Sequence, residues 1–271
     1  MSLRLEMLQV ARVAPKALED ASDLVRDFLL SQQHPDGGFC DRDGESDLYY
    51  TVFGLNALAA FQVEPDMNAV EKFLLKFEEG EGLDLVHLSC LCRCWGTLGQ
   101  KRMPKGLRKV LLNRLEAFRK PCGGWDNNPE REHGTAYGSF LALGAYQDLG
   151  KLPPKPFRIL QSLKHLETPD HAWKNHPNLP VGSTNPTAGA VVLLNNLHLP
   201  INAEVGKWLK KQLHPQGGFV AVPGAPMPDL LTTATALHSL AALEVRLTEE
   251  QTERCLDFID TLWSSKGGFH G

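Results

Sequence analysis

The sequence has no apolar run near the roughly 20 residues that a membrane-spanning helix needs. Its first residues lack the charged-then-apolar order of a signal peptide. Six cysteines in 271 residues are too few for a disulfide scaffold. Basic residues are not in excess either, because the chain has 28 Lys and Arg and 32 Asp and Glu. This balance does not favour binding to nucleic acid, which requires a positively charged surface. These absences predict a cytoplasmic protein without a membrane span or a nucleic-acid partner.

Three of the six cysteines, Cys90, Cys92 and Cys94, lie in one apolar stretch. Side chains two residues apart point to different faces of a helix, so this spacing does not favour a metal site. Free cysteines behave as small hydrophobic residues in protein cores. We therefore predict that these three are packing residues.

What the sequence does contain is an internal repeat. A glycine pair followed by an aromatic residue recurs, as in Gly37-Gly38-Phe39 and Gly217-Gly218-Phe219. Two degenerate copies, Glu81-Gly82-Leu83 and His171-Ala172-Trp173, fall between the clear ones. The residues that end the copies are at positions 39, 83, 125, 173, 219 and 269, which gives a period near 46. A fixed period of this length indicates stacked supersecondary units.

Each period contains two helical segments of different character. The segment before a copy is amphipathic, with Val70 and Phe73 at helical spacing as one example. The segment after a copy is apolar on most sides, which is typical of a helix in an interior. These apolar segments span residues 47–61, 84–98, 132–147, 184–197 and 229–243. We predict an all-α fold of about six helical hairpins, with amphipathic helices outside, apolar helices inside, and the hairpins closed into a ring.

We expect one domain over residues 1–271, with an N-terminal helix within residues 1–18 and repeats over residues 19–271. The last repeat is incomplete, because the sequence stops just after Gly267-Gly268-Phe269, where an inner helix begins in the other repeats. Two explanations stay open. Either the segment Leu3–Val13 takes the place of that inner helix and closes the ring, or the chain lacks a C-terminal segment.

The repeat length and the glycine-pair turn resemble those of the α/α-toroid superfamily, which contains the protein prenyltransferase β subunits and the squalene and related terpene cyclases. From about residue 19 onward the chain looks most like a geranylgeranyltransferase type II β subunit, with Arg42 after the first glycine pair and Tyr49-Tyr50 opening an aromatic-rich segment. The resemblance implies an isoprenyl diphosphate or other lipid in a central apolar cavity. It also implies a helical α-type subunit or protein substrate as partner, and a zinc ion that activates the acceptor thiolate.

The resemblance indicates candidate metal ligands as well. Family members hold zinc with Asp, Cys and His at the start of the inner helices. In this chain Asp47 matches the Asp and His87 matches the His, but Tyr49 stands at the place of the Cys. Asp84 is a weaker additional candidate. Asp47 and Asp84 also suit the N-cap of a helix, where a carboxylate accepts hydrogen bonds from free backbone N–H groups, and one carboxylate can serve both roles.

For the substrate, the resemblance indicates Arg42, Tyr49, Tyr50 and His133. Alignment of the inner segments on Thr135 places His133 in the first turn of the third inner helix, before Gly134, where the family has a phosphate-binding His-Gly pair. The companion lysine of the family is absent, since Glu45 takes its place.

Three functions follow from these residues. The first is a prenyltransferase β-like protein that binds an isoprenyl diphosphate and transfers it to an acceptor. The second is a non-catalytic toroid that binds a lipid or a protein, which the missing Cys and Lys favour. The third is an atypical terpene cyclase, although the Asp-x-Asp-Asp motif that carries the acid of such cyclases is absent from the sequence.

Overall fold

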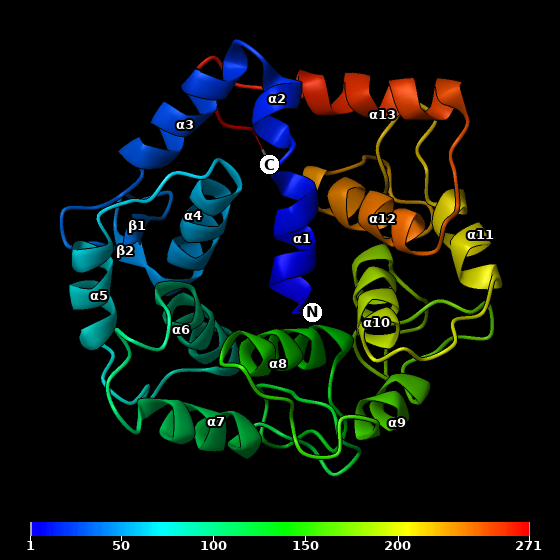
Figure 1. Cartoon of the computed structure of the whole chain (residues 1–271). Coiled ribbons are helices and arrows are strands. Elements are labelled where there is room, and N and C mark those ends of the chain that lie inside the picture. Colours follow the sequence, from blue (N-terminus) through cyan, green and yellow to red (C-terminus); the bar gives the residue numbers. More distant parts are fainter. Residues whose placement is uncertain (1, 271) are drawn as a thin grey trace. The chain divides into compact units, whose positions relative to one another are not determined.

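A computed structural model describes residues 2–270, which fall into two compact units. Unit 1 comprises Met1–Phe118, Leu141–Pro153 and Ser265–Gly268, and unit 2 comprises Arg119–Phe140, Pro154–Ser264 and Phe269–Gly271. The regular structure is almost entirely helical, as predicted (Figure 1). The one two-stranded sheet lies in unit 1, where β1 pairs with β2 in antiparallel orientation.

The elements of unit 1 are α1 (Leu3–Ala11), α2 (Ala14–Leu18), α3 (Ala21–Ser31), β1 (Phe39–Cys40), β2 (Ser46–Asp47), α4 (Leu48–Ala60), α5 (Met67–Leu75), α6 (Leu85–Leu98) and α7 (Leu107–Ala117). The boundary between the units falls inside α8 (Ala136–Asp148). The remaining helices of unit 2 are α9 (Arg158–Lys164), α10 (Thr184–Asn196), α11 (Glu204–Lys211), α12 (Leu230–Ala242) and α13 (Glu249–Thr261).

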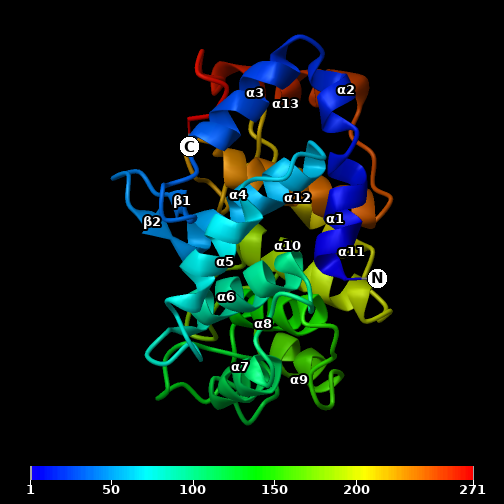
Figure 2. The ribbon, with the colours of Figure 1, turned by 60° about the vertical axis from the view of Figure 1, so that its left-hand side comes forward.

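Unit 1 has two layers of helices. The apolar helices α4 and α6 pack side by side, as Figures 1 and 2 both show, and α3, α5 and α7 contact them. Helix α4 buries residues on several sides, including Leu48, Val52 and Leu58, which are at most 1% exposed. Helix α5 buries only one stripe, formed by Val70, Phe73 and Leu74. This is the predicted pairing of an apolar inner helix with an amphipathic outer one.

Helix α1 is fixed to unit 1 by two apolar residues and an ion pair. Leu3 and Leu8 are buried, and α1 contacts α4. Arg4 Nε lies 3.1 Å from one carboxylate oxygen of Asp148, and Arg93 Nε lies 3.4 Å from the other. The Asp148 side chain is 1% exposed, and the two arginines compensate its buried charge. The predicted segment Leu3–Val13 therefore does form a helix, and its role as a substitute inner helix stays a prediction.

Unit 2 has the same plan. Helices α10 and α12 pack against each other, and α11 contacts both of them. Helix α10 buries eight of its thirteen residues, including Val191 and Leu194, whereas α13 buries only Cys255. Thr248 caps α13 with a complete capping box that includes Gln251, which explains why this exposed and acidic helix begins where it does.

The glycine-pair turns are tied to the inner helices by one recurring hydrogen bond. The backbone N–H of Phe39 donates to Thr51 Oγ1 at 2.9 Å, and that of Phe219 donates to Thr233 Oγ1 at 2.9 Å. Both threonines are fully buried, and both aromatic rings are at most 2% exposed. The turn, its aromatic residue and the first turn of the following helix thus form one packed unit in each repeat. Phe269 differs, because it is 45% exposed.

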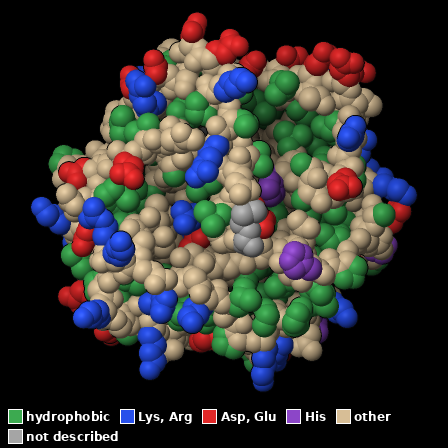
Figure 3. All heavy atoms as spheres, in the orientation of Figure 1, with side chains coloured by type: hydrophobic (Ala, Val, Ile, Leu, Met, Phe, Trp, Pro, Cys, Tyr) green, Lys and Arg blue, Asp and Glu red, His purple; other side chains and the backbone are tan. Residues whose placement is uncertain are grey.

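On the face shown in Figure 3, Lys and Arg side chains are interspersed with Asp and Glu, and acidic side chains gather over α13. The first turn of that helix carries Glu249 and Glu250. Within residues 2–270, no helix combines the length and apolarity required to span a membrane.

Candidate functional site

The first inner helix begins at Asp47, which fulfils its predicted N-cap role. Asp47 Oδ1 accepts hydrogen bonds from the backbone N–H groups of Tyr49 at 2.7 Å and Tyr50 at 3.2 Å. Asp84 caps α6 in the same way, through the backbone N–H of His87 at 2.8 Å. These bonds satisfy N–H groups that have no partner within the helix. The other carboxylate oxygen of Asp47, Oδ2, faces away from the cap.

His87 lies between the two capping carboxylates. Its Nδ1 is 2.8 Å from Asp84 Oδ1, and its Nε2 is 3.5 Å from Asp47 Oδ2. The three side chains, the Asp47–His87–Asp84 cluster, are 29 to 41% exposed, so water and ligands have access to them. Burial would raise the pKa of Asp84, but the hydrogen bonds from the His87 backbone and ring outweigh it and lower that pKa. The structure thus brings together all three residues predicted as metal ligands.

The geometry of this cluster differs from the coordination that a zinc ion needs. Zinc normally takes at least three protein ligands around one point. Here the two carboxylates lie against different nitrogens of the His87 ring, so each nitrogen faces one carboxylate and the three side chains do not converge on one point. Within residues 2–270, no group of three His, Cys, Asp or Glu side chains could hold a metal ion. With Tyr49 at the place of the family cysteine, the donor set does not fit the zinc that the resemblance implies.

Cys90 does not supply the missing thiolate. It lies three residues after His87 in α6 and is 2% exposed. Burial raises the pKa of its thiol to about 12 against the opposing effect of Arg93, so the thiol stays protonated at neutral pH. Cys92 and Cys94 are fully buried, and burial raises their pKa values as well. All three are packing residues, as predicted.

An aromatic group lies beside this cluster on α4. The Tyr49 ring makes edge-to-face contacts with Phe53 and Tyr50, at centroid distances of 4.9 and 5.9 Å. Phe53 is 51% exposed and Tyr50 is 36% exposed, although most of α4 is buried. We call Tyr49, Tyr50 and Phe53 the α4 aromatic face. The sequence analysis did not single out Phe53 as a candidate site residue, although its position one helical turn after Tyr49 indicates that the two rings share a face of the helix.

Arg42 occupies the hairpin that leads into α4. Strands β1 and β2 pair Phe39 with Asp47, and Asp41 Oδ1 holds the turn by accepting the backbone N–H groups of Asp43 and Glu45 at 2.8 and 3.0 Å. Arg42 is exposed and makes no hydrogen bond or ion pair with the described part of the chain. It is therefore a free cation on the hairpin whose second strand runs directly into the α4 aromatic face.

His133 belongs to unit 2, and its predicted place at the start of a helix is wrong. Helix α8 begins at Ala136, so His133 lies in the loop before it. The alignment on Thr135 is off by one helical turn, because Ser139 takes the role of Thr51: it accepts the backbone N–H of Trp125 at 3.3 Å. The His133 ring instead stacks on His165 at a centroid distance of 4.5 Å. Its Nδ1 is buried and has no hydrogen-bond partner within residues 2–270.

The equivalent helix pair of unit 2 lacks two members of the cluster. With the inner helices aligned on Thr51, Leu88, Thr187 and Thr233, Ser183 falls at the position of Asp47 and Thr232 at that of His87, while Asp229 keeps the carboxylate of Asp84. Thr232 Oγ1 instead accepts a hydrogen bond from Asn185 Nδ2 at 3.2 Å. The complete charged cluster is therefore a feature of unit 1 and not a requirement for packing two inner helices.

Comparison with known proteins gives the family. The sequence profile described as "Prenyltransferase alpha-alpha toroid domain" matches residues 5–87 and 186–271, more than half of the chain. The chain belongs to the prenyltransferase α/α-toroid family. This match confirms the predicted all-α toroid fold and the resemblance to this family. No curated protein sequence matches this family member significantly.

Among solved structures, the fold of this toroid protein is similar to that of Candida albicans protein geranylgeranyltransferase-I, in a structure complexed with GGPP. The TM-score is 0.63, and the match covers 88% of this chain and 85% of the other. The sequences are 15% identical, so this similarity extends to the fold alone.

Proposed function

We propose that this toroid protein binds an isoprenyl diphosphate, with its hydrocarbon chain on the α4 aromatic face and its diphosphate at Arg42. The observation that carries the proposal is the exposure of Tyr50 and Phe53 on a helix that is otherwise mostly buried. Exposed aromatic rings on α4 and an exposed cation on the hairpin that precedes it suit a ligand that is apolar at one end and anionic at the other. The GGPP complex of the structural relative supports this ligand class.

Binding is tested by titration with geranylgeranyl diphosphate, with the neutral alcohol geranylgeraniol as comparison. Arg42→Ala should weaken binding of the diphosphate by roughly tenfold, the effect of losing one charge-assisted hydrogen bond, and leave that of the alcohol unchanged. Arg246→Ala is the matched control, since it removes an exposed arginine from unit 2. The proposal is wrong if the wild-type protein does not bind the diphosphate, or if both arginine variants weaken it equally.

We further propose that the bound isoprenyl diphosphate is a substrate for transfer to a protein acceptor, and that a helical α-type subunit or the protein substrate is the partner. A chemical step of this kind breaks the C1–O bond with positive charge on carbon, and fixed cations such as Arg42 stabilise the departing diphosphate. His133 stays a separate candidate phosphate ligand, to be tested by His133→Ala. The six unpaired cysteines support a cytoplasmic location, where thiols are kept reduced.

The second candidate is a carrier that binds the lipid without transferring it. The misfit between the Asp47–His87–Asp84 cluster and zinc favours it, because the family activates its acceptor thiolate through that metal. The two candidates differ in what is recovered after incubation with a cysteine-containing acceptor protein. A transferase forms a thioether and releases diphosphate, whereas a carrier returns the intact prenyl diphosphate.

A further inference from the structure

The repeat turns differ at the position of the first glycine. In four of them this residue is glycine with φ between 91° and 103°, the left-handed region that side chains rarely adopt. A Cβ on any of these glycines would lie within 3.0 Å of an atom of the following outer helix, so that helix packs directly on the turn. The glycines and the outer-helix residues that they meet are Gly37 with Ala69, Gly123 with Arg158, Gly217 with Arg254, and Gly267 with Leu24.

The fourth repeat carries His171 at this position. His171 keeps the left-handed conformation, with φ at 65°, which is uncommon for a residue with a side chain. Its Cβ needs the space that the outer helix fills in the other turns, and its ring lies 3.3 Å from Asn202 and 3.6 Å from Glu167. Asn202 precedes α11, the outer helix that follows this turn. His171 therefore acts as a wedge between the turn and α11.

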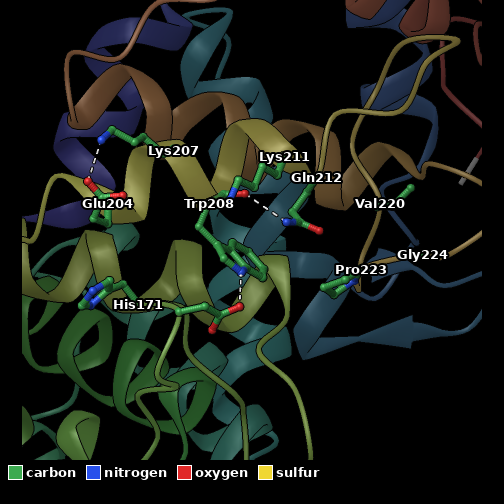
Figure 4. A pocket seen from close by; sticks show the side chains of 10 residues that line it. His171, Glu204, Lys207, Trp208, Lys211, Gln212, Val220, Pro223 and Gly224 are labelled. Carbon is green, nitrogen blue, oxygen red and sulfur yellow. Dashed lines mark hydrogen bonds and ion pairs between the residues drawn. The ribbon is translucent and has the colours of Figure 1, made fainter.

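A cavity of about 440 Å³ lies at this wedge, wholly within unit 2 (Figure 4). We call it the His171 pocket. The turn, α11 and the loop before α12 supply its walls, which include Trp208, Val220 and Pro223. Another cavity, of about 260 Å³, lies at the second repeat turn, where Glu81 replaces the first glycine.

The acidic groups of the His171 pocket already have partners. Asp170 accepts hydrogen bonds from Thr168 Oγ1 at 2.6 Å and from Trp208 Nε1 at 2.8 Å, and these bonds lower its pKa against the effect of burial. Glu204 pairs with Lys207 at 2.6 Å. Figure 4 shows the Trp208 and Lys207 contacts on two sides of the pocket. Both carboxylates are thus hydrogen-bonded within the protein, Glu204 to a cation and Asp170 to two neutral donors.

Lys211 is a charged residue of the pocket lining that has no ion-pair partner among the described residues. Its ammonium group makes no hydrogen bond or ion pair with any residue in the described range, although its charge contributes to the lowered pKa of Glu204. Nε2 of His171 is a further polar atom at the pocket, since the contacts to Asn202 and Glu167 involve Nδ1. The pocket thus offers a cation that no described carboxylate holds in an ion pair, with Val220 and Pro223 as apolar lining.

From this chemistry we propose that the His171 pocket is a second binding site, for a small molecule that carries a carboxylate or phosphate group on an apolar body. The volume lies within the range of small-molecule sites. Lys211 binds the anion, His171 holds α11 away from the turn, and Val220 and Pro223 contact the apolar body. This site is independent of the isoprenoid proposal, which concerns unit 1.

The test uses benzoate and phenyl phosphate as probes, with benzamide as the neutral analogue of benzoate. Protein labelled with 5-fluorotryptophan reports binding at Trp208 by ¹⁹F NMR, because each of the five tryptophans is assigned by its Trp→Phe variant. Dissociation constants on the order of 1 mM are expected for probes with about ten non-hydrogen atoms. The relative affinity of benzoate and phenyl phosphate tells whether the natural ligand is a carboxylate or a phosphate.

Three variants decide the outcome. Lys211→Gln should weaken both anions at least fivefold without changing the benzamide response, whereas Lys164→Gln, an exposed lysine at the end of α9, should change nothing. His171→Gly should fold normally, because four other turns carry glycine there, and should abolish the Trp208 shift by letting α11 close on the turn. The proposal is overturned if neither anion shifts Trp208, if benzamide binds as well as benzoate, or if His171→Gly still binds.

Discussion

The helix pairs α4–α6 and α10–α12 have the same architecture but different chemistry where their first turns meet. In unit 1, His87 lies 3.5 Å from Asp47 and 2.8 Å from Asp84. In unit 2, Ser183 stands at the position of Asp47 and Thr232 at that of His87, and only Asp229 keeps the carboxylate of Asp84. Both pairs pack side by side, although the Ser183 side chain makes no cap hydrogen bond to α10. The repeat therefore folds without the charges of Asp47 and His87.

This difference separates what the fold requires from what a site requires. Asp47 and Asp84 cap their helices, so the fold accounts for both carboxylates. An exposed ion pair contributes little stability, so the fold does not require His87 between them, and unit 2 has Thr232 at that position. The exposed rings of the α4 aromatic face are better explained by a ligand. The predictions below test how far the two units share their stabilising contacts and where they differ.

The largest effect is expected at Asp148 of unit 1, a buried carboxylate that pairs with two arginines. Asp148→Ala leaves Arg4 and Arg93 without their buried counter-charge and should lower the free energy of unfolding by about 3–5 kcal/mol. Arg4→Ala should cost less, because Arg93 still pairs with Asp148. Urea denaturation of both variants checks this. A cost for Asp148→Ala no greater than that for Arg4→Ala would contradict it.

A smaller effect is expected at the hydrogen bond that both units share. Thr51→Val and Thr233→Val preserve the shape of the side chain but leave the buried N–H of Phe39 or Phe219 without an acceptor. Each should lower the free energy of unfolding by about 1–3 kcal/mol. Thr248→Val, at the exposed cap of α13, is a comparison site where water replaces the lost bond. If the two buried threonines differ widely in cost, the turns are not equivalent and the comparison of the units fails.

The smallest effect is expected in the dependence of the unfolding free energy on pH. The pKa of Asp84 is lower in the folded protein than its ordinary value of 3.8, so the ionised carboxylate stabilises the fold above that pH. This contribution disappears as the pH falls through the lower native pKa. The difference in unfolding free energy between wild type and Asp84→Asn should therefore be largest above pH 4 and shrink below it. Asp229→Asn, the cap of α12, controls for loss of a cap.

Amide hydrogen exchange across α6 at pH 3 and pH 6 measures this effect. An Asp84→Asn difference that grows as the pH falls would contradict the assignment of the lowered pKa to the contact with His87.

Much of the fold followed from the sequence because the repeat imposes it. The turn signature, the apolar inner helices and the capping aspartates are local patterns, and the structure has each of them. The pairing of Asp47 with His87 across two repeats rested instead on the resemblance to the prenyltransferase family. The position of His133 was wrong because the loop before α8 is longer than the alignment assumed, and Ser139 does in the third repeat what threonine does in others.

The His171 pocket could not have been found in this way. The sequence showed that a glycine is missing at residue 171, but not that the backbone keeps its left-handed conformation and holds α11 away. Likewise the exposure of Phe53 depends on what packs around α4 and not on the pattern of its own helix. Both features arise from contacts between segments that are distant in the sequence.

The most direct test of the isoprenoid proposal is photo-crosslinking with a geranylgeranyl diphosphate analogue that carries a benzophenone at its hydrocarbon end. The account predicts that the label attaches to the peptide containing Tyr49, Tyr50 and Phe53, and that excess geranylgeranyl diphosphate prevents it. Labelling confined to peptides outside α4, or labelling that the natural diphosphate does not displace, would contradict it.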